Sequence, residues 1–178
     1  PGTLLAGANN VSTAAGVGDT FRPGGTGEHL RAGDLLRTDA SGHAEVDWPD
    51  GSLTRLGPAT LLRISPLAHP DKRQVKVRLD VGQTWHRVQR VTGQGGYDVE
   101  TPVGVASVRG TRFAVACTAE PACDFKVIEG TVVVTPTGGA PVTLTAGEGL
   151  HVRGNTPAGA THAAGGDALS AAPWCAAH

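Results

Sequence analysis

Apolar and polar residues alternate with a period of two along much of the chain. Within residues 74–81, valine or leucine at positions 75, 77, 79 and 81 alternates with lysine, arginine or aspartate, and shorter stretches around Val46 and Leu144 do the same. This period is typical of strands with one buried face. Turn residues separate the stretches, and no window shows the pattern of a capped amphipathic helix. The pattern therefore predicts an all-β domain with little or no helix.

The first hairpin that can be specified surrounds Pro49-Asp50-Gly51. Proline presets a type I turn, and glycine suits the left-handed position that follows it in a three-residue hairpin loop. This loop predicts a register that places Glu45 opposite Arg55.

The second hairpin has Thr118–Ala122 as its loop and predicts that Cys117 lies opposite Cys123. In this register every large residue of both strands falls on one face. Opposite residues at a hairpin end have about the Cα separation that a disulfide needs, so we expect a Cys117–Cys123 disulfide and an oxidising compartment. The alternative is two reduced cysteines packed as small apolar side chains.

The third cysteine, Cys175, has no evident partner and could link a second chain. A zinc site that adds Cys175 and His178 to the cysteine pair is a weaker alternative, because the five-residue spacing between Cys117 and Cys123 is wider than that of a zinc knuckle. We therefore expect no metal and no other cofactor.

One device recurs along the chain: an apolar residue, a glycine three positions later, and then a strand. Its glycines are Gly33, Gly82, Gly130 and Gly147. Repeated kinks of this kind predict a twisted β-sandwich or a solenoid-like stack of antiparallel hairpins. The short last step argues against a strict solenoid.

The composition divides the chain into three parts. Residues 11–153 hold the alternating pattern and form the predicted β-domain. Residues 1–10 read as an N-terminal extension, and residues 154–178, rich in alanine, glycine and proline, read as a partly disordered tail. The start at Pro1 without methionine suggests an excised or processed piece.

Charge and motifs exclude several functions. A formal net charge of -1 lacks the positive excess that is typical of a protein that binds nucleic acid. No apolar run is long enough to cross a bilayer, so membrane attachment would need segments beyond this sequence. No serine elbow, phosphate-binding loop or histidine pair with metal-ligand spacing occurs, which predicts a protein that is not an enzyme. Arg109 could bind a carboxylate on a partner or pair within the domain.

Several short motifs, in this order and spacing, resemble the FecR domain family over about residues 11–152. They are the turn at Asp50-Gly51, the stretch from Thr101-Pro102 to Arg109-Gly110-Thr111, and the pair Glu129-Gly130. The resemblance implies an extracytoplasmic β-domain. The best-understood members of that family are single-pass membrane regulators that carry a signal, often from a siderophore receptor, to a sigma factor.

Together these observations predict an extracytoplasmic, periplasmic or cell-surface, module that binds a protein or a cell-envelope component through exposed loops or a sheet edge. One alternative is an assembly domain of a surface protein, dimerised through Cys175. Another is a cupin-like pocket for a small molecule or sugar, lined by Trp48, Trp85 and histidines.

Overall fold

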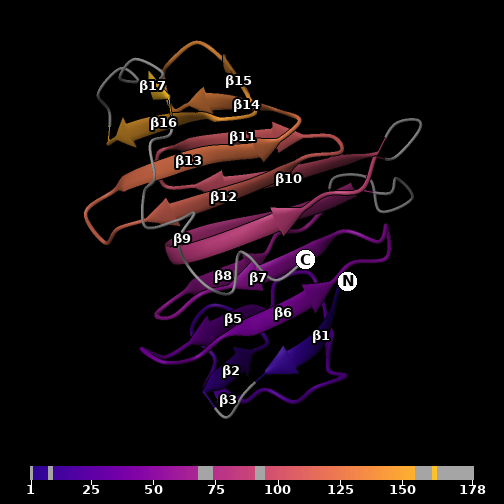
Figure 1. The fold of residues 1–178 in the computed structure, drawn as a ribbon. Coiled ribbons are helices and arrows are strands. Elements are labelled where there is room, and N and C mark those ends of the chain that lie inside the picture. Colours follow the sequence, from indigo (N-terminus) through magenta and orange to yellow (C-terminus); the bar gives the residue numbers. More distant parts are fainter. Residues whose placement is uncertain (1, 8–9, 68–73, 91–94, 155–161, 164–178) are drawn as a thin grey trace.

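The computed structural model describes residues 2–7, 10–67, 74–90, 95–154 and 162–163. They contain no helix, as the pattern predicts, and their strands form two stacked sheets joined by the long strand β9 (Figure 1). Except at their first edges, where β4 precedes β1 and β3 precedes β2, both sheets follow the chain order from one end of the molecule to the other. The fold thus combines a sandwich with the progressive winding of a solenoid-like stack.

The sheet at the front of Figure 1 is a series of paired strands in the described residues. Their order is β4 (His29–Leu30), β1 (Gly2–Gly7), β6 (Ala44–Asp47), β7 (Leu53–Leu56), residues 82–87 of β9 (Gln74–Arg87), β12 (Arg112–Cys117), β13 (Ala122–Glu129), β16 (Glu148–Arg153) and β17 (His162–Ala163). All neighbours in it are antiparallel.

The back sheet has a matching series. Its order is β3 (Arg22–Pro23), β2 (Val11–Ala14), β5 (Leu35–Thr38), β8 (Leu61–Ile64), residues 74–81 of β9, β10 (Gly96–Thr101), β11 (Gly104–Val108), β14 (Thr131–Pro136) and β15 (Val142–Thr145). Only β9 and β10 are parallel among these described pairs.

Glycines mark the points where the chain changes sheets. At these points φ lies between 88° and 105°, a backbone conformation that residues other than glycine rarely adopt. The glycines are Gly33, Gly82, Gly130 and Gly147. At Gly82 the change occurs inside one strand, and a Cβ there would also collide with the backbone of Thr60. The predicted glycine kinks are therefore confirmed, and their role is to turn the chain from one layer into the other.

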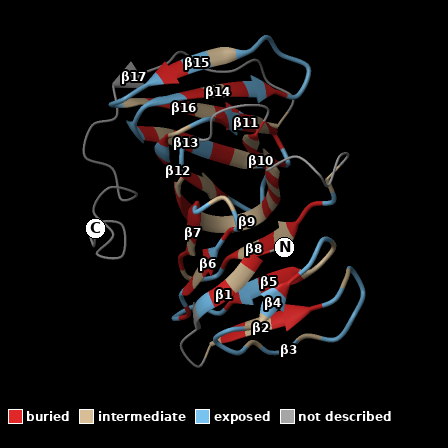
Figure 2. Cartoon of the chain, turned by 90° about the vertical axis from the view of Figure 1, so that its right-hand side faces the viewer, coloured by how far each residue is buried: buried red, intermediate tan, exposed pale blue. Residues whose placement is uncertain are grey.

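The core lies between the two sheets, where buried residues follow the interior of the stack (Figure 2). The predicted registers are confirmed: Glu45 pairs with Arg55, and Cys117 pairs with Cys123. The alternating residues of the second hairpin belong to this core, namely Phe113, Val115, Cys117, Cys123, Phe125 and Val127, whereas Ile128 near the end of β13 is exposed.

The N-terminal segment differs from the expectation that residues 1–10 lie outside the β-domain. Gly2–Gly7 forms β1, which pairs with β4 and β6, and Leu4 is fully buried in the core. Its pattern is too short to show alternation, so only the tertiary pairing reveals it. Within the predicted tail, His162–Ala163 forms β17 against β16.

Candidate functional site

The Arg109-Gly110-Thr111 motif forms the corner at which β11 of the back sheet leads into β12 of the front sheet. Gly110 has φ of 62°, and Gly130, at the next corner, packs so closely that a Cβ there would lie 2.9 Å from the Gly110 carbonyl oxygen. The Thr111 hydroxyl is buried and donates to the Thr131 carbonyl at 2.9 Å. These residues fasten two corners together, which is a structural role.

The Asp50-Gly51 turn has a similar role. Asp50 accepts hydrogen bonds at 2.8 Å from both the backbone N–H and the hydroxyl of Ser52. The Ser52 hydroxyl oxygen in turn accepts from the backbone N–H of Gln89 at 3.0 Å. Gly51 has φ of 82°, as the predicted loop requires. The turn thereby fixes the chain where it leaves β9.

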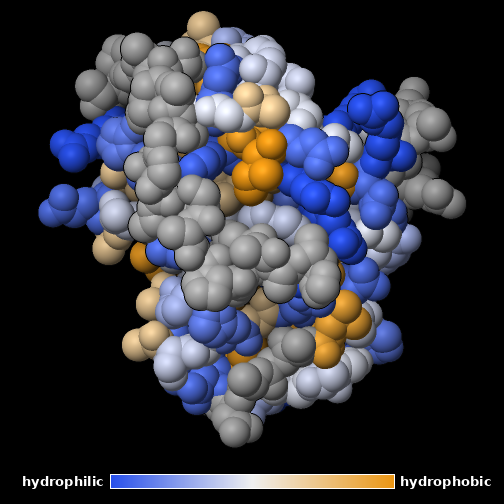
Figure 3. Space-filling model, viewed as in Figure 1, coloured by the Kyte–Doolittle hydropathy of each residue, from blue (hydrophilic) through white to orange (hydrophobic). Residues whose placement is uncertain are grey.

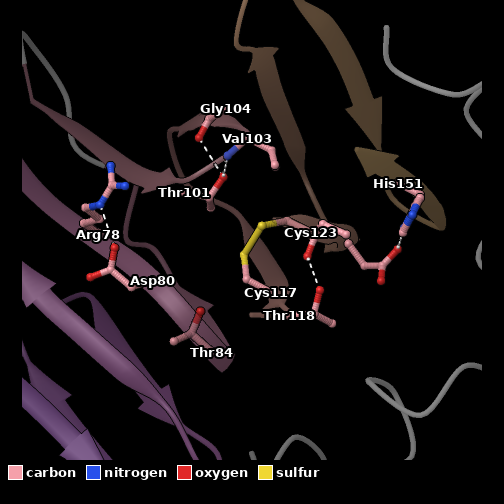
Figure 4. Close-up of a disulfide and its surroundings, with 12 residues drawn as sticks. Arg78, Asp80, Thr84, Thr101, Val103, Gly104, Cys117, Thr118, Cys123 and His151 are labelled. Carbon is pink, nitrogen blue, oxygen red and sulfur yellow. Dashed lines mark hydrogen bonds and ion pairs between the residues drawn. A yellow bond between two sulfur atoms is a disulfide. The ribbon is translucent and has the colours of Figure 1, made fainter. Parts of the chain in front are cut away.

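Thr101 and Pro102 form the turn between β10 and β11. The buried Thr101 hydroxyl donates to the Gly104 carbonyl at 2.8 Å, and its oxygen accepts from the Val103 N–H at 3.3 Å (Figure 4). Pro102 is exposed at the tip. Again the motif shapes the backbone.

Two charged members of the motifs lie at the surface. Glu129 forms an ion pair with Arg112, with Nε and Oε2 3.4 Å apart. Arg109 is exposed, and no described residue forms a hydrogen bond or ion pair with its guanidinium. Arg109 is therefore the motif residue best placed to bind something outside the domain.

Arg109 borders an open groove of about 510 Å³ on the outer face of the back sheet. The floor comes from three adjacent strands, because Asp98 of β10 pairs with Ser107 of β11, which pairs with Val133 of β14. The other lining residues are Gln74, Gly95, Gly96, Val108 and Thr131. The groove is polar, shallow and accessible from solvent.

The carboxylates of β10 divide into a paired and an unpaired one. Glu100 accepts from Lys76 at 2.8 Å and from Ser65 at 3.0 Å. Burial alone would raise the pKa of the Glu100 carboxyl, but these partners outweigh burial and leave its pKa below the ordinary value. Asp98, on the same face, has no hydrogen-bond or ion-pair partner among the described residues. The groove thus offers both a free carboxylate and a free guanidinium.

A buried polar cluster inside the sandwich is invisible in the sequence motifs. His86 Nδ1 lies 2.8 Å from the Tyr97 hydroxyl, which also contacts Thr54, and the Trp48 indole N–H donates to the Thr54 hydroxyl at 2.9 Å. Burial lowers the pKa of His86 to about 3 and raises the pKa of Tyr97. The side chains satisfy one another within the core, so the cluster is structural.

Trp48 and Trp85 do not line a common pocket, which removes the geometry that a cupin-like site would need. Both are buried, as expected of packing residues, but Trp48 belongs to the core between the sheets. Trp85 belongs to a separate cluster with Leu53 and Ala114.

The predicted disulfide joins Cys117 and Cys123, both buried, at the end of the β12–β13 hairpin (Figure 4). Next to it lies an open hollow of about 700 Å³, lined by the 118–122 loop and by His151, Arg153 and Gly154. The two sulfurs bond each other and cannot bind zinc as thiolates. The described residues hold no cluster of three or more metal-ligating side chains, while Cys175 and His178 lie outside them.

Within the part of the chain that the structure describes, no helix has the length and apolar character needed to cross a membrane. No curated protein matches the sequence.

Two solved crystal structures share the fold, both assigned as a candidate anti-sigma factor from Parabacteroides distasonis. One has a TM-score of 0.60 and 21% identity over 72% of this chain and 57% of that one. The other has a TM-score of 0.64 and 21% identity over 79% of this chain and 63% of that one. The chain therefore spans less than two thirds of either protein, and this identity establishes a common fold alone.

The family comparison is more direct. The family model described as FecR protein matches residues 34–133, which is more than half of the 178 residues and includes every motif residue named above. The chain belongs to the FecR protein family.

Proposed function

We propose that this domain is the non-catalytic sensory module of a FecR-type regulator that controls a sigma factor and that it works outside the cytoplasm. Family membership and the fold shared with two candidate anti-sigma factors support the regulatory role. The Cys117–Cys123 disulfide supports an oxidising compartment, because such bonds are rare where thiols are kept reduced.

We further propose that the groove beside Arg109 binds the protein partner. The observation that carries this assignment is the exposed guanidinium, which stands at a groove and has no partner in the described part of the domain. Other charges on the same sheet are paired, as Lys76 is with Glu100 and Arg78 with Asp80, while Asp98 on the groove floor has no partner among the described residues. Arginine holds a carboxylate through two parallel hydrogen bonds, so a partner segment that presents a carboxylate fits this position.

Site-specific photo-crosslinking in the native host tests the proposal. A photoreactive residue replaces Ser107 on the groove floor of the full-length protein, and the same residue at Asp47, an exposed position of β6 in the other sheet, serves as control. We expect one cross-linked partner of defined mass from position 107 and none from position 47.

Two arginine variants sharpen the result. Arg109→Ala should lower the yield at position 107 by about tenfold, which corresponds to about 1.4 kcal/mol of binding free energy. Arg153→Ala, which removes another exposed arginine without a described partner, should leave the yield unchanged. Equal yields from Arg109→Ala and the unaltered protein, or a partner captured only from position 47, would overturn the groove assignment.

A further inference from the structure

The outer face of the front sheet carries an apolar patch, defined as Leu53, Trp85 and Ala114. The three residues lie on β7, β9 and β12, where Ala114 pairs directly with Trp85 and the pair Phe113–His86, one position along, faces the core. Successive side chains point to opposite faces of a sheet, so the patch faces outward. Figure 3 views this face, on which apolar and charged residues lie side by side.

The patch is buried although it lies outside the sandwich. Leu53 is 6% exposed, Trp85 3% and Ala114 0%. Arg55 accounts for part of the cover, since its guanidinium carbon lies 5.3 Å from the centroid of the Trp85 ring. The Nε of the neighbouring Arg87 is also inaccessible to solvent and has no hydrogen-bond partner among the described residues. An outward face with these properties is suited to a covering segment that brings apolar side chains and a hydrogen-bond acceptor.

We propose that the C-terminal segment 164–178 of the same chain docks across this patch, with Trp174 as its anchor. Leu169 and Trp174 are the large apolar residues of that segment, and Asp167 is its one carboxylate side chain. The aromatic ring matches the patch, and Asp167 supplies an acceptor of the kind that Arg87 lacks.

The path of the chain permits this docking. The last described strand, β17, belongs to the same sheet and lies four strand steps from β9, through β16, β13 and β12. Four steps span about 19 Å at the usual strand spacing. Eleven residues lead from Ala163 to Trp174, and an extended segment of that length reaches up to about 36 Å.

Hydroxyl-radical footprinting of the monomeric chain, read by mass spectrometry, tests the docking. The intact chain should label Trp85 as slowly as Trp48, which lies in the inter-sheet core. Trp174→Ala, and a chain ending after Ala163, should each raise the Trp85 labelling rate at least fivefold. His178→Ala, a change elsewhere in the segment, should leave that rate unchanged.

Trp48 reports whether each variant remains folded, because its labelling rises only if the sheets separate. Fast labelling of Trp85 in the intact chain, or an unchanged rate after Trp174→Ala and truncation, would overturn the proposal. Protection of Trp85 that disappears on tenfold dilution would also overturn it, since it would identify a second copy as the cover. The Arg109 groove lies on the other sheet, so either assignment can fail without the other.

Discussion

The two halves of β9 present opposite polarity to the same core. In residues 74–81 the side chains of valine and leucine point inward, while Lys76, Arg78 and Asp80 point outward. In residues 82–87 the inward side chains are Thr84 and His86, and Trp85 is the outward one. The strand keeps its period of two, but the distribution of polar groups reverses at Gly82.

This reversal separates the two outer faces of the sandwich. The first half contributes a solvated ladder of ion pairs, in which Asp80 contacts both Arg63 and Arg78. The second half contributes a buried polar cluster on the inside and an apolar patch on the outside. The difference teaches that the outer face beside the first half carries paired charges, whereas the outer face beside the second half carries the buried apolar patch.

Substitution of Gly82, the junction between the two halves of β9, should have the largest effect on the free energy of unfolding. Gly82→Ala places a Cβ at φ of 105° and against the Thr60 backbone, and we expect a loss of roughly 4 kcal/mol or more in the free energy of unfolding. Gly18→Ala is the matched control, because Gly18 has φ of 94° and no atom of the described residues lies within 4 Å of the position that its Cβ would take. It should cost only about 1 kcal/mol. Equal losses in urea denaturation would contradict the close approach at Gly82.

Protonation of His86, in the second half of β9, should have the next largest effect on the free energy of unfolding. The pKa of His86 is about 3 in the folded domain, against 6.5 for an exposed histidine side chain. Below pH 6.5 the unfolded chain therefore binds a proton at His86, whereas the folded domain does not. Stability is complete above that pH and falls as the pH drops toward the folded pKa, by on the order of 4 kcal/mol.

His86→Gln removes that titrating group and provides the comparison. Between about pH 6.5 and about pH 5, the free energy of unfolding of the unaltered domain should fall more steeply than that of the variant. Parallel slopes in the two denaturation series would show that His86 is not held neutral in the core.

The disulfide lies in the front sheet next to Gly82, because Cys117 pairs with Gly82 across the β9–β12 ladder. Replacing both cysteines, Cys117→Ala with Cys123→Ala, should lower the free energy of unfolding by about 2 kcal/mol because the unfolded chain gains conformational freedom. Guanidinium denaturation measures the loss. A double variant as stable as the unaltered chain would mean that the loop gains no constraint from the bond.

We expect the smallest effect on the free energy of unfolding from a substitution on the outer face of the first half of β9. Lys76→Ala removes an ion pair with Glu100 whose side chains are 34% and 26% exposed. Partly exposed pairs contribute at most about 1 kcal/mol, and salt screens them. The loss should shrink further in roughly 0.5 M NaCl as measured by thermal unfolding; a large, salt-independent loss would contradict the solvated character of this face.

The sequence predicts the local geometry well because local geometry depends on short-range constraints. The cysteine register follows from a hairpin in which Phe113, Val115, Phe125 and Val127 share one face with the cysteines. The kinks at Gly33, Gly82, Gly130 and Gly147 follow from a recurring sequence device. Both features are confirmed in the structure.

The tertiary placements could not be predicted in the same way. A period of two shows that Trp85 and His86 face opposite sides, but only the change of sheet at Gly82 decides that His86 faces the core. Leu4 enters the core through pairing with a strand about forty residues away. Arg109 could be internal or free on sequence grounds, and only the packed corners show that its guanidinium faces a groove.

The most direct test of the regulatory account is a comparison of transcripts in the native host. Deletion of residues 34–133 and the single substitution Arg109→Ala should change the same sigma-dependent transcripts in the same direction, while Arg153→Ala leaves them unchanged. A deletion that alters those transcripts while Arg109→Ala keeps them at the unaltered level would contradict signalling through the groove, and a deletion that alters none would contradict the regulatory role itself.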